Sequence, residues 1–456
     1  ALADLFEGTF ENHRATLYRD VSRLPAAHHL AVDGDDVQVG RHWQFDRTNE
    51  ITLPSDADYE EGYRAHLVEA VRCRIPDDGS VGAMLSGGLD SSSVACIASE
   101  LLSGAGQGPL PTFSNIFSDA PESDEGPFID AVLTRGHLTP TFNQGGRHDP
   151  LDSLDHLIDL HGAPFFGANF FLVEALGALA GNAGVSVLLD GFGGDSTTSH
   201  GWHRLRELSR RQPIQLAREV RLLGPALGGP WPVSYLDLVW KEGLVPRFPK
   251  RAQRIARRHF RPSKTTTPEP ILDARFAAQV AVGRGPSKRR VYGPILTARD
   301  QHFYEMTTAA MPAATEITDR VARSAGVEFR YPFLDRRLAE YCLALPSDQK
   351  LRNGWSRSIA RRALADVLPP EVCWRRGKAD LSHNFAHVLS THSRKALDDA
   401  IERDPGPLEG VLNIDGLRAA LGRLDVGCAT PEDLQSLWMA TVTRRWLQRI
   451  GSPIDH

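Results

Sequence analysis

The stretch Ser86-Gly87-Gly88-Leu89-Asp90-Ser91-Ser92 decides both the fold and the chemistry of this chain. It follows an apolar segment, 81–85, that is typical of a buried strand, and it opens a helical segment, 91–102. Two adjacent glycines let the backbone turn sharply and approach a ligand closely. The first amides of a helix present positive charge, and three serine hydroxyls add hydrogen-bond donors. The motif therefore predicts a cradle for an anion the size of pyrophosphate.

Asp90 places a carboxylate inside this predicted anion cradle. A carboxylate suits that position when a cation accompanies the anion, and Mg²⁺ is the hard cation that prefers oxygen ligands. The chain has no GxxxxGK[ST] sequence, which excludes a Walker-type γ-phosphate site, and no GxSxG sequence, which argues against a hydrolase nucleophile elbow. We expect a magnesium-assisted phosphate site of a different type.

A second glycine-rich turn, Asp190-Gly191-Phe192-Gly193-Gly194-Asp195, also follows an apolar strand, 185–189. Ligands of open parallel sheets bind beyond the carboxyl ends of the strands, so both turns should open on the same edge. Asp195 can then face Asp90 across one magnesium ion. The alternative is a capping turn whose aspartates are unrelated to the first motif.

Strands and helices alternate along the chain, which predicts an α/β fold with a parallel sheet flanked by helices on both faces. A capping-box pattern at Ser55 and Asp58 predicts a helix start. Asp-Gly and Gly-Asp pairs that are flanked by apolar residues predict a hairpin over 30–39. The last third of the chain is expected to be mostly helical. The other expected elements are a strand over 112–117, helices over 125–134 and 170–180, and a terminal helix with Leu434, Leu437, Trp438, Val442 and Trp446 on its buried face.

Composition limits the class of protein. The 456 residues carry 52 basic and 57 acidic side chains, a net charge of −5, which argues against non-specific nucleic-acid binding. Five scattered cysteines, with no CxxC pair, favour a reduced cytoplasmic protein. Residues 1–15 lack the apolar core of a signal peptide, and Glu174 and Asn182 interrupt the most apolar stretch, 170–189. No membrane-spanning helix is expected.

Four motifs in order resemble those of the asparagine synthetase family, which has the adenine-nucleotide α-hydrolase fold. SGGLDSS resembles its pyrophosphate loop, 191–195 its second motif, 326–335 its third motif and 374–378 its C-terminal lysine loop. The resemblance implies a synthetase domain over 51–456 that uses ATP and Mg²⁺. Such enzymes activate a carboxylate as its acyl-adenylate with release of pyrophosphate, and a nitrogen nucleophile then forms an amide and releases AMP.

The resemblance also implies roles for individual residues. Asp90 and Asp195 should hold magnesium, and Lys378 should stabilise the acyl-transfer step, although a plain surface lysine is the alternative. Glu328 could orient a substrate or accept a proton, or it could form a structural ion pair with a nearby arginine. The residues expected to hold the nucleotide are Leu85, Ser86, Gly87, Gly88, Asp90, Ser91, Ser92, Ser114, Asn115, Gly191 and Phe192.

The chain departs from asparagine synthetases in two places. Residues 1–50 resemble only a β remnant of the end of a glutaminase-like domain, with no cysteine before Cys73, so no glutamine hydrolysis is expected from them. In the second motif, Phe192 and Ser196 stand where that family usually carries acids. The related β-lactam synthetases use tyrosine at the position of Phe192, in a base dyad with a glutamate matching Glu328, and phenylalanine cannot complete that dyad.

The stretch 188–195, followed by 199–201 and the helix over 205–208, resembles lasso-peptide cyclases, as do residues 354–357, which lead to 374–375. These enzymes activate an Asp or Glu side chain of a precursor peptide, and the peptide's N-terminal amine closes a macrolactam ring. The resemblance implies a precursor-peptide substrate and, as partners, a leader-binding protein and a leader peptidase. The alternatives are an asparagine synthetase or another small-molecule amidotransferase, including a β-lactam-synthetase-like enzyme, and an inactive nucleotide-binding scaffold.

Two features near the second motif leave alternatives open. A basic helical insertion at about 200–265 could hold the peptide or could be a solvated surface. His200 and His203 could form a metal pair but lack a third ligand of matching spacing. His200 could instead take the proton from the attacking ammonium, or it could have only a packing role.

Overall fold

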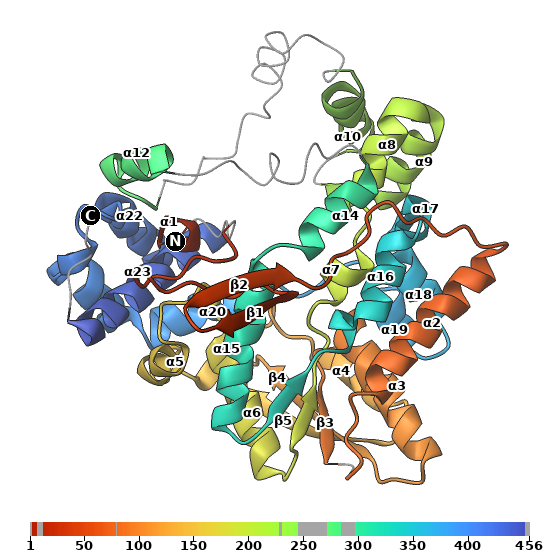
Figure 1. The fold of residues 1–456 in the computed structure, drawn as a ribbon, viewed down its shortest axis with the longest axis horizontal. Coiled ribbons are helices and arrows are strands. Elements are labelled where there is room, and N and C mark those ends of the chain that lie inside the picture. The colour runs from red at the N-terminus through yellow and green to blue at the C-terminus, as the bar shows by residue number, and fades with distance from the viewer. Residues whose placement is uncertain are drawn as a thin grey trace.

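The chain folds around a five-stranded parallel sheet with strand order β5-β4-β3-β6-β7 (Figure 1). The computed structural model describes residues 2–6, 12–78, 80–227, 230–244, 271–283 and 297–451. All four neighbouring strand pairs run parallel. The predicted α/β class is therefore confirmed. The strands are β3 (Val81–Met84), β4 (Leu110–Ile116), β5 (Leu138–Gln144), β6 (Val187–Leu189) and β7 (Glu328–Arg330).

Helices cover both faces of this sheet because its strands are apolar on both sides. On β6, Val187 and Leu189 belong to one buried cluster, and Leu188 belongs to another. The first cluster contains α2 (Asp56–Arg72), α3 (Leu89–Gly104), α4 (Gly126–Leu133) and α16 (Arg336–Ala344). The second contains α6 (Phe170–Asn182) and α15 (Ala310–Ser324).

The predicted helix start at Ser55 is confirmed, and the predicted terminal helix also begins with a capping box. Ser55 and Asp58 form the capping box of α2, and Thr430 and Asp433 form that of α23 (Pro431–Ile450). The predicted apolar face of α23 is buried. It packs with the C-terminal helices α20 (Leu381–Thr391) and α22 (Ile414–Asp425) and with α5 (Leu154–His161), and this group of helices gathers at one end of the molecule (Figure 1).

The N-terminal part contains the predicted hairpin, formed by β1 (His28–Asp33) and β2 (Asp36–Arg41). A short helix that the sequence analysis did not predict, α1 (Leu2–Phe6), precedes it. Ala3 and Phe6 are three positions apart, so they share one helix face, and both are buried in the cluster of C-terminal helices. Long-range packing therefore stabilises this helix.

The predicted helical insertion is helical where it is described. It comprises α8 (His203–Arg211), α9 (Pro213–Leu223), η2 (Gly224–Leu227), α10 (Trp231–Leu238) and η3 (Val239–Leu244). The basic stretch 247–264 lies outside the described residues. The remaining elements are η1 (Gly145–Arg147), α7 (Gly194–Thr198), α12 (Ala274–Gly283), α14 (Ala298–Met306), η5 (Pro332–Leu334), α17 (Ser347–Lys350), β8 (Leu351–Arg352), β9 (Trp355–Ser356), α18 (Ser358–Ala363), α19 (Pro370–Cys373), α21 (Arg394–Asp398), η6 (Asp399–Arg403) and η7 (Gly406–Leu408). Among the described helices, none combines the length and apolarity needed to cross a membrane.

Candidate active site

The first glycine-rich loop connects β3 to α3 at the carboxyl edge of the sheet. Leu85 is buried and extends the strand pairing, since its amide donates to Phe113 O at 2.9 Å. Beyond it the chain turns, and Gly88 precedes the first residue of α3. The side chain of Ser91 folds back onto Ser86, with Oγ atoms 2.9 Å apart and the Ser86 amide donating to Ser91 Oγ at 3.1 Å. Hydrogen bonds between Ser86 and Ser91 therefore hold the two ends of the first loop together.

The second loop connects β6 to α7 and lies directly against the first. The amide of Asp190 continues the sheet by donating to Arg330 O at 3.0 Å. A Cβ atom on Gly191 would lie 2.4 Å from Ser91 N, and one on Gly194 would lie 2.3 Å from Asp90 Cγ. Only glycine permits this approach, so the two loops interlock backbone to backbone.

One guanidinium joins the two loops. Arg357 Nη1 lies 2.6 Å from Asp90 Oδ2 and 2.6 Å from Asp195 Oδ1. Arg357 comes from the junction between β9 and α18, where it adopts a left-handed backbone with φ of 51°. A single cation therefore contacts both carboxylates that the sequence placed across one magnesium ion.

These carboxylates have unequal environments. Burial raises the pKa of Asp90, and the facing Arg357 only partly offsets that effect. A hydrogen bond with His200 and the charge of Arg357 hold the pKa of Asp195 well below its usual range. Burial also raises the pKa of Asp190 to about 6, although its Oδ1 accepts a hydrogen bond from Phe192 N at 3.0 Å.

The two loops form one wall of a pocket of about 400 Å³. Basic side chains from the C-terminal half line the facing wall. Arg375 forms an ion pair with Glu125 at 2.7 Å and stacks over the Phe128 ring at 3.7 Å, which fixes it in place. Lys378 is exposed and also lines the pocket. The lining residues are Ser86, Gly88, Leu89, Asp90, Ser91, Asp190–Ser196, Met311, Arg357, Arg361, Val372, Arg375, Gly377 and Lys378.

Comparison with known proteins identifies the family of the chain that carries this site. The family model described as asparagine synthase matches residues 62–448, which include both loops and Lys378. The chain belongs to the asparagine synthase family. It is 23% identical to asparagine synthetase [glutamine-hydrolyzing] 3 of Bacillus subtilis (strain 168) over 378 residues, covering 79% of this chain and 54% of that protein. Asparagine synthetase 2 of the same organism is 22% identical over 442 residues, covering 91% and 53%.

Similarity to mammalian proteins is more local. The bovine (Bos taurus) asparagine synthetase [glutamine-hydrolyzing] is 31% identical over 91 residues, covering 18% of this chain and 16% of that protein. The chain spans about half the length of the two B. subtilis relatives it matches.

The structure brings most of the predicted site residues together. Ser86, Gly88, Asp90, Ser91, Gly191, Phe192, Asp195 and Lys378 all line the pocket. Gly87 lies in the turn between them, with φ of 71°. Ser92 is buried beneath the loop, and its Oγ has no hydrogen-bond partner among the described residues.

Three residues predicted to hold the nucleotide, Leu85, Ser114 and Asn115, lie on or next to the strands and not in the pocket lining. Leu85 is part of the buried core. Ser114, on β4, is buried, and its hydroxyl also has no partner in the described part of the chain. Asn115 Oδ1 accepts a hydrogen bond from Asn143 Nδ2 at 2.7 Å. Their contact with a nucleotide stays a prediction.

The predicted histidines separate into two environments. His200 Nε2 lies 3.4 Å from Asp195 Oδ1, at the edge of the site. His203 Nε2 instead faces Glu305 Oε1 at 3.7 Å. Among the described residues, no cluster of three or more His, Cys, Asp or Glu side chains could hold a metal ion. The structure thus gives no support to a histidine metal pair.

Among the predicted catalytic residues, Glu328 lies outside the pocket lining. It begins β7, its side chain is half exposed, and its Oε1 accepts from Arg330 Nε at 2.9 Å. This hydrogen bond holds the pKa of Glu328 below its usual value. The geometry matches the ion-pair alternative, and a catalytic role for Glu328 stays untested.

Phe192 packs edge-on against Tyr331, with ring centroids 5.8 Å apart. The Tyr331 hydroxyl is 2.6 Å from Thr318 Oγ1, so it is engaged away from the loop aspartates. This side of the pocket is therefore aromatic.

The donor set fits the ATP and Mg²⁺ that the family implies. Asp90 and Asp195 both contact the Arg357 guanidinium, so their carboxylates converge on one positive charge. Two converging carboxylates suit a magnesium ion whose other ligands are phosphate oxygens. The start of α3, which lines the pocket, supplies amides and hydroxyls for the anion. The buried hydroxyls of Ser92 and Ser114, which lack a hydrogen-bond partner in the described part of the chain, are further polar groups beside the loops.

Sequence reasoning missed the basic wall and its central arginine. Arg361 lies in α18, four residues after Arg357 at the N-cap of that helix, and each lines the pocket. That spacing was the available signal, but arginine pairs at this spacing are common on helix surfaces. Only the fold shows that this pair faces the two loops.

Proposed function

We propose that this chain is an ATP- and Mg²⁺-dependent, AMP-forming carbon–nitrogen ligase. The observation that supports it best is that Asp90 and Asp195, on two interlocked glycine loops, both contact the Arg357 guanidinium. Membership in the asparagine synthase family supports the same class of reaction. Relatives named asparagine synthetases make an amide-forming reaction the natural expectation.

The pocket residues suit the two chemical steps. In the first step a substrate carboxylate attacks the α-phosphorus of ATP, and the bond to pyrophosphate breaks. The loop amides and the hydroxyls of Ser86 and Ser91 would hold the leaving pyrophosphate, while Asp90 and Asp195 would hold the metal. Magnesium supplies positive charge to the phosphate oxygens. In the second step an amine attacks the acyl carbon, the bond to AMP breaks, and Lys378 would offset the developing negative charge.

Within this class we propose a lasso-peptide cyclase. It would adenylate an Asp or Glu side chain of a precursor peptide, and the peptide's N-terminal amine would close the macrolactam. A leader-binding protein and a leader peptidase would then be its partners. The attacking amine must lose a proton, and His200, beside Asp195, is the proposed acceptor.

The polar groups of the pocket support a peptide carboxylate over free aspartate. Free aspartate carries an ammonium group that needs a carboxylate partner. Among the described lining residues the carboxylates are Asp90, Asp190 and Asp195. The first and last are paired with Arg357, and Asp190 accepts from Phe192 N. Phe192 itself presents an apolar ring, which suits a side chain within a peptide.

The second candidate is an asparagine synthetase or another small-molecule amidotransferase, favoured by the printed names of the relatives. The test follows AMP and product mass together. The protein is incubated with Mg-ATP and either a leaderless precursor peptide or aspartate plus ammonia. Peptide-dependent AMP with loss of one water from the peptide supports the cyclase. AMP with new asparagine, and an unchanged peptide, overturns it in favour of the small-molecule enzyme.

Two variants make this test specific. Asp90→Ala should abolish AMP formation while the fold is retained, because the metal loses its buried ligand. Gly104→Ala is the control, since a Cβ there meets no atom within 4 Å. AMP release by Asp90→Ala at the wild-type rate would refute the magnesium assignment. ATP binding without AMP release under every substrate would indicate an inactive scaffold.

A further inference from the structure

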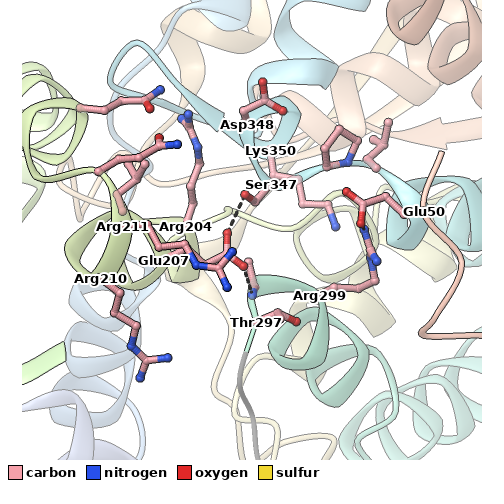
Figure 2. Close-up of a pocket in the computed structure, with 16 residues that line it drawn as sticks. Glu50, Arg204, Glu207, Arg210, Arg211, Thr297, Arg299, Ser347, Asp348 and Lys350 are labelled. Atoms are coloured by element: carbon pink, nitrogen blue, oxygen red, sulfur yellow. Dashed lines mark hydrogen bonds and ion pairs between the residues drawn. The ribbon is translucent and has the colours of Figure 1, made fainter. Parts of the chain in front are cut away.

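A second pocket, of about 570 Å³, lies between α8, the start of α14 and the segment 345–350 (Figure 2). We call it the α8–α14 pocket. Its volume is in the range of sites for small metabolites. Five basic and three acidic residues line it, and one of the basic residues, Arg204, is paired with the buried Glu219 outside the lining. They are Arg204, Arg210, Arg211, Arg299 and Lys350, with Glu50, Glu207 and Asp348.

Two of these acids are already engaged. Glu207 crosses the floor of the pocket, where Oε1 accepts from Ala298 N and Oε2 accepts from Ser347 Oγ, both at 2.7 Å (Figure 2). Glu50 forms an ion pair with Arg299 at 2.7 Å. Each carboxylate is held by these partners, and the charge of Glu207 also acts on Lys350, where it offsets part of the effect of burial. Figure 2 shows Arg210 and Arg211 on one side of the pocket and Arg299 and Lys350 on the other.

Lys350 is the unusual member of the lining. Its side chain is 1% exposed, and within the described ranges no carboxylate forms an ion pair with it. Its Nζ lies 2.8 Å from His302 Nδ1. His302 Nε2 faces two backbone oxygens, those of Ser196 and Thr197, at 2.9 and 3.0 Å. Nε2 must therefore carry the ring proton, and Nδ1 accepts from Lys350.

The Lys350 ammonium has a neutral ring and the Leu343 carbonyl, 3.4 Å away, as its hydrogen-bond partners, and the charges of Glu207 and Glu305 only partly compensate its burial. Burial lowers the pKa of Lys350 to about 7, and the nearby Arg299 adds to that effect. An anion in the adjoining cavity would strongly stabilise the protonated form of this buried amine, because the low-dielectric protein around it screens their attraction little.

We propose that the α8–α14 pocket binds a small anion bearing a carboxylate or phosphate group, with Lys350 as its inner contact and Arg211 at its rim. Lys350 offers its third N–H to the ligand. Arg211 ends α8, forms no ion pair with a described residue and stands across the cavity (Figure 2). The ligand is expected to carry more than one charge, since the pocket places cations on both sides.

Binding of such a ligand could change the position of active-site residues, because two short structural connections link the α8–α14 pocket to them. His302 links Lys350 to the backbone of α7, the helix that carries Asp195. Lys350 also precedes β8, whose hairpin with β9 leads directly to Arg357. The α8–α14 pocket is therefore positioned as an effector site. The inference does not depend on the proposed reaction, because its test measures binding alone.

The test is calorimetric titration of the whole protein with inorganic phosphate and, separately, with succinate. We expect the wild type to bind at least one of them. Lys350→Met and Arg211→Gln should each weaken that binding at least tenfold, whereas Lys395→Gln, an equal loss of charge at an exposed site, should not. Phosphate can also occupy the first glycine loop, so its titration is repeated with Ser91→Ala, which should leave binding at the α8–α14 pocket intact.

The titrations identify which anion the α8–α14 pocket binds, or they overturn the proposal. Phosphate binding alone identifies a phosphate site, succinate alone a carboxylate site, and both a shared anion site. If neither anion binds the wild type, or if Lys395→Gln weakens binding as much as Arg211→Gln does, the proposal is overturned. Arg211 lies at the surface, so its variant keeps the test decisive even if Lys350→Met fails to fold.

Discussion

Replacing Arg357 with methionine removes the single nitrogen that lies 2.6 Å from both Asp90 and Asp195. The Asp90 side chain is 20% exposed, and leaving a buried carboxylate without its partner costs about 3–5 kcal/mol. Burial raises the pKa of Asp90, so proton uptake limits this cost. Asp195 is half exposed and adds about 1 kcal/mol or less. Without metal, we expect the variant to lose about 2–4 kcal/mol of unfolding free energy.

Magnesium should reverse this loss, because it can take the position that Arg357 Nη1 occupies. A ligand at a hundred times its Kd stabilises a protein by about 2.7 kcal/mol. In the wild type Arg357 competes for the same oxygens, so magnesium without nucleotide should shift the melting temperature less. The assay is thermal unfolding in chelator and across a magnesium titration.

The matched control for this experiment is Arg352→Met. Arg352 lies on the same hairpin, and its ion pair with Asp56 is exposed at the surface, so its loss should cost less than about 1 kcal/mol. The reasoning is refuted if the Arg357 variant is as stable as this control in chelator. It is also refuted if magnesium shifts the wild type and the Arg357 variant equally.

Three further changes test other parts of the structure. Gly191→Ala should abolish AMP formation and lower the melting temperature, because its Cβ would lie 2.4 Å from Ser91 N, whereas Gly104→Ala should do neither. Lys378→Met should lower amide formation about 10²–10³-fold with an unchanged melting temperature, and an unchanged rate would contradict its assigned role. Burial lowers the pKa of Lys350 to about 7, so the unfolded chain binds more protons than the folded one above that pH. Stability should therefore rise between about pH 7 and 8.5 and be flatter in Lys350→Met; equal slopes would contradict this.

The sheet edge and its two loops could be predicted because their signals are local. A buried strand, a glycine-rich turn and a helix start follow one another within each motif, and parallel strands bring such turns to one edge. The hairpin over 30–39 and the capping box at Ser55 are local in the same way. These predictions needed no knowledge of distant contacts.

The features that the sequence did not reveal depend on distant contacts or weak patterns. β5 contains Pro140, which lacks an amide donor and argues against a strand, yet it is tolerated because β5 lies at the sheet edge. β7 is three residues long and pairs with β6 far away in the chain. Arg357 follows two very short strands, and nothing in its neighbourhood indicates the aspartates it contacts.

The role of Glu328 shows a limit of motif matching. The motif around it occurs in family order, but the side chain points to Arg330 rather than into the pocket. A motif fixes the position of a residue in the chain, whereas the ion pair it forms depends on which neighbours are available.

The contact between Gly191 and Ser91 has a consequence for how this protein can be changed. Because the two loops touch through their backbones, neither leaves room for an added side chain at the points of contact. A substitution that moves one loop by a fraction of an ångström must be matched by the other, although they are far apart in sequence. Libraries that aim to alter substrate choice should therefore treat residues 86–92 and 190–195 as a single cassette, and chimeras should exchange both loops together.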